Sequence, residues 1–124
     1  PETARTFARD AEKNGFGVII SIAGKAAHLG GVLASHTLLP VIGIPVSSPD
    51  FSGMDALLST VQMPPGVPVA SMAVGGAVNA AVFAAQILAL SDTELARRLD
   101  ADRNDMRDKV IRKDKEIGER FNGN

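Results

Sequence analysis

Charge is distributed very unevenly along this sequence of 124 residues. Over residues 16–90 the only charged side chains are those of Lys25, Asp50 and Asp55, whereas residues 91–124 hold nine acidic and nine basic residues. A long stretch with so few charges must be buried on several sides, which is typical of strands at the centre of a parallel sheet. The charge-rich remainder is typical of a solvated helix. The sequence therefore predicts a buried core followed by an exposed helix.

Apolar runs alternate with helical patterns throughout the first part of the chain. Strands are expected at residues 16–23, 41–46 and 67–74. Helices are expected at residues 1–14, 26–35, 54–63 and 77–90. This alternation predicts a parallel sheet with helices on both faces, which is a three-layer α/β fold. We expect this core to occupy residues 1–90.

The last helix, within residues 91–124, has a start signal and an apolar stripe. Ser91 and Glu94 form a capping-box pattern. The stripe recurs with an eleven-residue period, which keeps it on one side of a nearly straight helix. Its residues are Leu95, Leu99, Met106, Val110, Ile117 and Phe121. We expect the stripe to pack on neighbouring subunits. The alternative is a helix folded along its own domain.

The first expected helix starts at Pro1, with no residue before it to cap the helix. A missing cap costs a helix about 1 kcal/mol. This observation predicts a chain that is cut at its front, so the lack of a signal peptide carries little weight.

Composition and missing motifs exclude several functions. Without cysteine, a disulfide framework, a thiolate zinc site and a cysteine nucleophile are all excluded. Two histidines are too few for a histidine-rich metal site. The net charge of −1 gives no excess of positive charge for binding nucleic acid. Gly and Pro break every apolar run that could span a membrane. Neither a GxxxxGK[ST] loop nor a GxGxxG loop is present. We expect no metal, nucleic-acid partner or membrane segment.

The most informative segment is the run of small residues around His28, at residues 21–31. It follows a buried strand and opens a helix, which is where ligands bind in open α/β sheets. Free N–H groups at the start of a helix favour an anion such as a carboxylate. We expect His28 in the first turn, facing this crevice. A histidine packed under the sheet edge is the equal alternative.

Two further segments could line the crevice. The loop at residues 47–53 follows a strand and offers hydroxyl groups, although an ordinary serine-rich loop explains it better. The turn at residues 62–66 is rigid and has a polar residue at its tip, and by itself it indicates only the end of a helix. His36, near the end of its helix, is interpreted as structural because an imidazolium there meets a favourable helix dipole.

Taken together, these segments resemble the small subunit family of phosphoribosylaminoimidazole carboxylase, whose bacterial members are N5-carboxyaminoimidazole ribonucleotide mutases. The resemblance extends from Pro1 to about Leu90, and several separate blocks agree in order and spacing. The matching blocks are residues 23–29, 39–46, 52–64, 66–70 and 79–88.

The resemblance implies a flavodoxin-like fold in a cytoplasmic homo-octamer. It implies conversion of N5-carboxyaminoimidazole ribonucleotide to 4-carboxy-5-aminoimidazole ribonucleotide in purine synthesis, with CO2 trapped between two steps and no cofactor. His28 would be a catalytic histidine beside the CO2 or carboxylate. The residues implied in substrate binding are Ala23, Gly24, Lys25, Ala26, Ala27, Leu29, Ser47, Ser52, Gln62, Met63 and Pro64.

Three departures from the family pattern stand out. Lys25 replaces a usual glycine, and the loop at Gly75 and Gly76 looks short. The family's opening strand, its Gly-Ser-x-Ser-Asp loop and its Ser-Ala-His-Arg motif, with the main catalytic histidine, are absent from this sequence. Three alternatives therefore stay open. They are a related carboxylase that uses free CO2, an inactive fragment that keeps only assembly surfaces, and a generic nucleotide-binding domain, which the missing phosphate motifs weaken.

Overall fold

The computed structural model describes residues 1–122 and divides into two compact units, Pro1–Leu88 and Ala89–Asn124. The strands are β1 (Ile19–Gly24), β2 (Val41–Val46) and β3 (Ala70–Ser71). The helices are α1 (Glu2–Asp10), α2 (Leu29–Ala34), α3 (Met54–Val61), α4 (Ala77–Ala89) and α5 (Thr93–Asn122).

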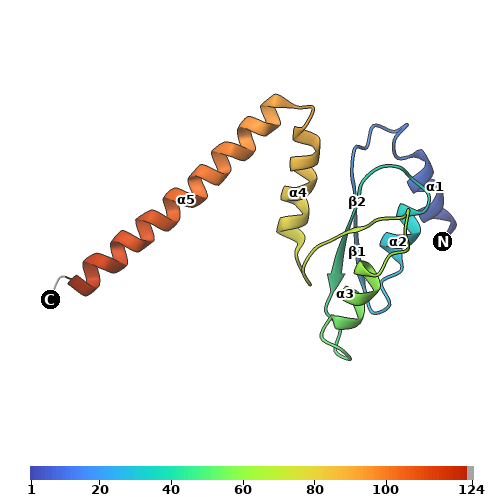
Figure 1. Ribbon diagram of the computed structural model, residues 1–124, viewed down its shortest axis with the longest axis horizontal. Helices are drawn as coiled ribbons and strands as arrows, with labels where there is room; N and C mark the ends of the chain where they lie inside the picture. Colours follow the sequence, from blue (N-terminus) through green and yellow to red (C-terminus); the bar gives the residue numbers. More distant parts are fainter. Residues whose placement is uncertain (123–124) are drawn as a thin grey trace. The chain divides into compact units, whose positions relative to one another are not determined.

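The three strands form one parallel sheet in the order β1-β2-β3. Helices α1, α2 and α3 lie on one side of this sheet and α4 on the other (Figure 1). The prediction of a three-layer, flavodoxin-like α/β fold with a long C-terminal helix is confirmed.

Strand β2 carries the core on both of its faces. Val41 packs with Ala8 of α1 and Leu33 of α2, whereas Ile42 packs with Ala80 of α4. Five of the six residues of β2 are buried. This burial explains why the sequence of the strand shows a continuous apolar run instead of an alternating one.

The strands on either side of β2 are shorter than expected. The predicted strand at residues 16–23 is wrong at its start, because the Phe16 amide donates to Ala11 O at 3.1 Å and pairing begins only at Ile19. The predicted strand at residues 67–74 shortens to β3. Pro68 lacks an N–H group, so it cannot donate a hydrogen bond to the ladder there.

Two helices also end earlier than predicted. Helix α1 ends at Asp10, and the chain then turns until Gly15, which has the expected left-handed conformation with φ +83°. Helix α3 ends at Val61 because Gln62 leaves the helical region with ψ 74°. The Pro64 and Pro65 pair that follows cannot continue a helix.

Helix α5 starts later than the capping-box pattern predicts. It begins at Thr93, and the amide of Leu95 donates to Asp92 Oδ1 at 2.9 Å, so Asp92 occupies the cap position instead of Ser91. Glu94 accepts hydrogen bonds from Arg97 and Arg98, and these lower the pKa of its carboxyl group.

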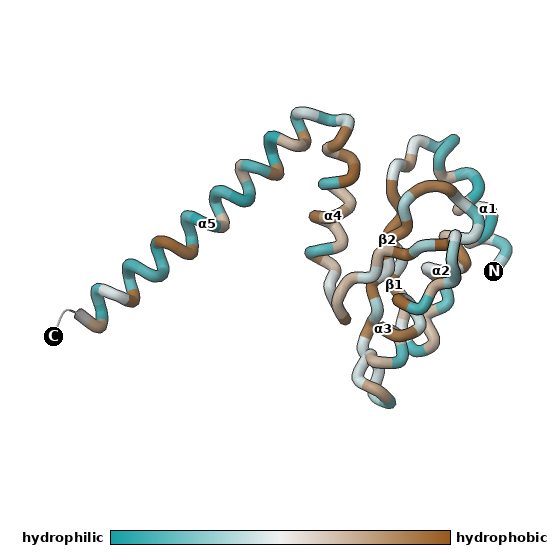
Figure 2. The backbone as a smooth tube through the Cα atoms, in the orientation of Figure 1, coloured by the Kyte–Doolittle hydropathy of each residue, from teal (hydrophilic) through white to brown (hydrophobic). Residues whose placement is uncertain are grey.

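The residues of α5 are mostly hydrophilic, with single hydrophobic residues spaced along the helix (Figure 2). The expected stripe is largely exposed within its own unit, with Val110 at 67% and Phe121 at 81%. Among residues 1–122, no helix is both long and apolar enough to cross a lipid bilayer.

The close approach of β2 to α3 can be tested at Gly43. A Cβ atom there would overlap Thr60 Cγ2 and lie 2.9 Å from Val69 Cγ1. We expect Gly43→Ala to lower the free energy of unfolding by about 1–3 kcal/mol, measured in urea. Adding Thr60→Ser, which removes the overlapping methyl group, should restore part of the loss.

Gly118→Ala is the matched control, because nothing lies within 4 Å of a Cβ atom at that position in α5. It should leave stability unchanged or raise it by up to about 1 kcal/mol, since alanine favours a helix over glycine. Equal losses from the two alanine substitutions would contradict the close packing.

Candidate functional site

The loops that follow β1 and β2 start at the same edge of the sheet. Gly24 and Val46, the last residues of the two strands, are register partners. Each strand then passes into a loop, residues 25–28 after β1 and residues 47–53 after β2. An ion pair joins the loops, with Lys25 Nζ 3.9 Å from Asp50 Oδ2. The carboxyl edge of the sheet therefore brings together the two segments that the sequence singled out.

Both loops hold their backbone in left-handed conformations. In residues 1–122, the non-glycine residues with positive φ are Lys25 (54°), Ala27 (42°) and Ser52 (52°), and all lie in these loops. Gly53 continues the second loop with φ +88°. Such backbone strain persists only where the surrounding structure enforces it, and it clusters at functional sites. Strain therefore marks the same edge of the sheet as a candidate site.

Helix α2 begins three residues later than predicted. The sequence predicts a helix from Ala26, but the left-handed Ala27 cannot belong to one, and α2 starts at Leu29. His28 therefore occupies the cap position and does not lie in the first turn. The Ala27 amide donates to Gly24 O at 3.0 Å, so this N–H group is already used within the loop.

His28 lines a cavity of about 410 Å³ between α2 and α3. Its imidazole is exposed and makes no capping hydrogen bond to α2. The residues that line the cavity are Ala26, Ala27, His28, Gly31, Val32, Ser35, Ser59 and Met63. A wall of this kind, with one imidazole and two hydroxyl groups among small apolar residues, suits a polar heterocyclic ligand.

Met63 closes the cavity on the side of α3. A Cβ atom on Gly31 would lie 3.2 Å from Met63 Sδ, so the glycine allows the thioether to pack directly on α2. Ser59, one turn before Met63, donates its hydroxyl hydrogen bond to Asp55 O at 2.8 Å. The turn after α3 thus contributes to the site through Met63.

The remaining predicted residues lie at three places. Ala23 and Gly24 end β1, while Lys25, Ser47 and Ser52 lie on the two loops at the sheet edge. Leu29 is exposed on the first turn of α2. Gln62 and Pro64 are exposed in the turn after α3. The structure brings Ala26, Ala27, His28 and Met63 into one cavity and leaves the other predicted residues outside its lining.

Two hydroxyl-bearing residues of the His28 cavity were not predicted. Ser35 and Ser59 line the cavity with His28. The spacing of residues 28, 31, 32 and 35 follows one helical face, and this signal could have identified Ser35. Three side-chain oxygens, Ser48 Oγ, Asp55 Oδ1 and Ser71 Oγ, are buried without a hydrogen-bond partner. No sequence pattern distinguishes these three.

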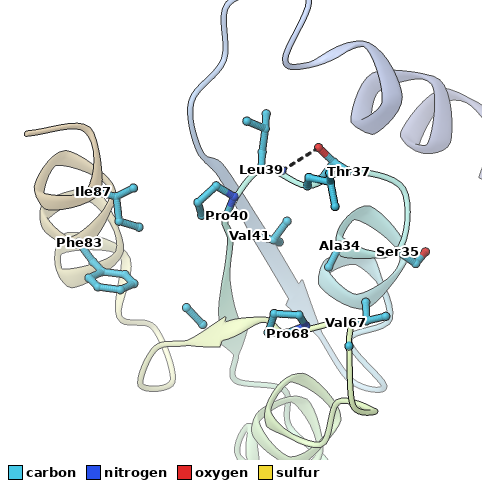
Figure 3. A pocket seen from close by; sticks show the side chains of 13 residues that line it. Ala34, Ser35, Thr37, Leu39, Pro40, Val41, Val67, Pro68, Phe83 and Ile87 are labelled. Atoms are coloured by element: carbon cyan, nitrogen blue, oxygen red, sulfur yellow. Dashed lines mark hydrogen bonds between the residues drawn. The ribbon is translucent and has the colours of Figure 1, made fainter. Parts of the chain in front are cut away.

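A second cavity, of about 560 Å³, lies at the opposite, amino ends of β2 and β3 (Figure 3). Pro40 and Pro68 face it from the segments leading into the strands, and Phe83 and Ile87 face it from α4. Its wall is mainly apolar and includes none of the predicted site residues. Among residues 1–122, no three His, Cys, Asp or Glu side chains gather closely enough to hold a metal ion.

The sequence matches the family of AIR carboxylase over residues 1–109. The chain belongs to the AIR carboxylase family. It is 52% identical over 111 residues to the N5-carboxyaminoimidazole ribonucleotide mutase of Saccharolobus solfataricus, covering 90% of this chain and 70% of that protein. The match to the mutase of Escherichia coli strain K12 is 52% over 113 residues, covering 90% and 67%. The mutase of Bacillus subtilis strain 168 is 51% identical, with coverage of 90% and 70%.

The family match includes every residue of the His28 cavity and of the two loops at the sheet edge, since all lie before residue 109. The predicted resemblance to this family is therefore confirmed. Its relatives bear the name of an enzyme, which agrees with the enzymatic function expected from the sequence.

The packing that holds the loop at residues 47–53 can be tested at Gly53. A Cβ atom there would lie 2.7 Å from Val74 Cγ1 and 3.1 Å from Ser47 Cα, and the backbone is left-handed. We expect Gly53→Ala to lower the free energy of unfolding by about 2–4 kcal/mol, the sum of backbone strain and steric overlap.

Gly66→Ala separates these two causes. Gly66 has φ +93°, but nothing lies within 4 Å of its Cβ position. The free energy of unfolding of this variant, measured in urea, should fall only by the cost of backbone strain, about 1–2 kcal/mol. If Gly53→Ala costs no more than Gly66→Ala, the contact with Val74 does not constrain the loop.

Proposed function

We propose that this chain supplies an N5-carboxyaminoimidazole ribonucleotide mutase with its α/β core and part of its active site. The observation that carries this proposal is 52% identity to relatives of that name over 90% of the chain. The identity extends across the His28 cavity and the strained loops at the sheet edge. The reaction is the transfer of a carboxylate from nitrogen to carbon within one substrate, a step of purine synthesis.

The proposed chemistry has two stages. The bond between the exocyclic nitrogen and the carboxylate carbon breaks, the nitrogen takes up the electron pair and a proton from a general acid, and CO2 is released into a closed pocket. The neighbouring ring carbon then attacks the trapped CO2, and a histidine removes the proton from that carbon as general base. Enclosure keeps the effective concentration of CO2 high, so recapture competes with escape.

We assign His28 a place beside the carboxylate or CO2 during this transfer. Its imidazole makes no capping hydrogen bond, and it lines a cavity large enough for a small heterocycle. Ser59 and Met63 form the facing wall on α3. His36 is a poorer candidate because it lines a different hollow, with Arg9 and Glu12.

The His28 assignment is tested by steady-state kinetics of the complete enzyme. We expect His28→Ala to reduce kcat by a factor of roughly 10²–10³, the range for loss of one group that stabilises charge in the transition state. The assembly should remain intact, because the side chain is exposed and supports no helix. His36→Ala is the control and should retain kcat within a factor of about three, a loss below 1 kcal/mol. Unchanged turnover in His28→Ala would make His28 structural.

Bicarbonate dependence separates the mutase from a carboxylase that uses free CO2. The mutase should convert N5-carboxyaminoimidazole ribonucleotide at a rate that added bicarbonate does not alter. A carboxylase should start from the uncarboxylated aminoimidazole ribonucleotide and require bicarbonate. The second activity has no specific support among the relatives named above, so the mutase is the function we propose.

We further propose that the protein is a cytoplasmic homo-octamer in which α5 packs on neighbouring subunits. The stripe on α5 is half or more exposed at Met106, Val110, Ile117 and Phe121 within its own unit. An apolar stripe along one side of a helix is the pattern by which a helix packs on another element.

Light scattering of two matched variants tests this role of α5. Val110→Asp places a charge in the exposed stripe, and we expect the mass of the assembly to fall, because an unpaired buried charge opposes association by several kcal/mol. Arg112→Asp places the same side chain two residues away, on another face of the helix, and should leave the mass unchanged. A wild-type protein that is a uniform monomer would contradict the proposal.

A further inference from the structure

Lys25 occupies a backbone conformation that a lysine adopts only at a cost. It follows the last residue of β1 with φ 54°, in the left-handed region that glycine enters freely and other residues avoid. Its side chain is 76% exposed, so burial of the aliphatic stem does not compensate for the strain. A strained, exposed residue at the edge of a ligand site is a candidate for a role in function.

Lys25 is also an isolated cation. Over residues 16–90 no other lysine or arginine occurs. Its carboxylate neighbour, Asp50, is 65% exposed and lies 3.9 Å away. An exposed ion pair of this length contributes almost nothing to folding stability. The pair therefore does not explain why a lysine stands here, although it does hold the ammonium group between the two loops.

We propose that the ammonium group of Lys25 binds an oxyanion of the substrate, taking it in exchange for Asp50. This inference rests on the proposed function, whose substrate is a ribonucleotide with a phosphate group and a carboxylate group. Both are oxyanions that a lysine binds as a compact point charge. Asp50 holds the ammonium group over the sheet edge until the substrate replaces it.

The exchange predicts opposite effects for the two charges. Loss of the cation removes an attraction for the substrate. Loss of Asp50 removes a competitor for the cation. Lys25→Met should therefore raise KM, while Asp50→Asn should lower it. If the ion pair were purely structural, losing either partner would change KM in the same direction.

Kinetics of the complete enzyme at low ionic strength provide the test. We expect Lys25→Met and Lys25→Gly to raise KM by about tenfold, the typical scale for loss of one charge-assisted hydrogen bond, with kcat changed by less than about threefold. Asp50→Asn should lower KM by about twofold, and Lys25→Arg should keep KM close to the wild-type value. Added salt should raise KM of the wild type more steeply than KM of Lys25→Met, because salt screens exposed charges.

Two variants separate the charge from other causes. Lys13→Met removes an exposed lysine from the turn after α1, outside the site, and should leave KM unchanged. Lys25→Gly removes the ammonium group and relieves the left-handed strain at the same position. If strain were responsible for substrate binding, Lys25→Gly and Lys25→Met would differ in KM.

Binding of two ligands identifies which oxyanion is involved. The probes are 4-carboxy-5-aminoimidazole ribonucleotide and the matching nucleoside, which lacks the phosphate group. If Lys25 binds the phosphate group, Lys25→Met should lower the affinity for the ribonucleotide and leave the affinity for the nucleoside unchanged. If Lys25 binds the carboxylate group, the substitution should lower the affinity for both ligands by the same factor. Either pattern supports the proposal.

Unchanged KM and unchanged ligand affinity in Lys25→Met, in a wild-type enzyme that catalyses the conversion, would overturn this inference alone. A wild-type enzyme that fails to convert N5-carboxyaminoimidazole ribonucleotide would overturn the proposed function, and the assignment of Lys25 with it.

Discussion

The parallel pairing of β1 with β2 is the constraint on which the rest of the core depends. Six register pairs, from Ile19 with Val41 to Gly24 with Val46, fix the two strands at the same level. Because both strands run in the same direction, the loops that follow them must leave from one edge. The ion pair between Lys25 and Asp50 exists only because of this register. A shift by one residue would also exchange the two faces of β2, so that Ile42 would face α1 and α2 instead of α4.

The fold could be predicted where the sequence marks both the strand and its ends. Strand β2 begins directly after Pro40 and was predicted with its observed bounds, 41–46. Strand β3 was predicted too long, since its apolar residues look the same whether or not they join the ladder. Pro68 removes a donor, the ladder pairs Ala70 and Ser71 with β2, and beyond it the amides of Met72 and Gly75 donate single hydrogen bonds to Gly43 O and Pro45 O. Hydrophobic pattern thus locates a strand, while the available hydrogen-bond donors set its length.

The start of α2 shows the limit of such reasoning for the site. Alanine and lysine both favour helices, so a helix beginning at Ala26 was the natural prediction. Tertiary packing overrides that preference, and Lys25 and Ala27 adopt left-handed conformations instead. The alternation of strands and helices placed the loop at the carboxyl end of β1, where the structure has it. It could not supply the backbone angles, so neither the cavity beside His28 nor the ion pair to Asp50 followed from the sequence.

Those backbone angles decide which neighbour each side chain meets. In a continuous helix, residues 25 and 28 would lie on one face, three positions apart. The left-handed turns at Lys25 and Ala27 break that relation. Lys25 then meets the loop after β2, while His28 lines the cavity against α3. A single short loop can therefore place a cation and an imidazole on two different neighbouring segments.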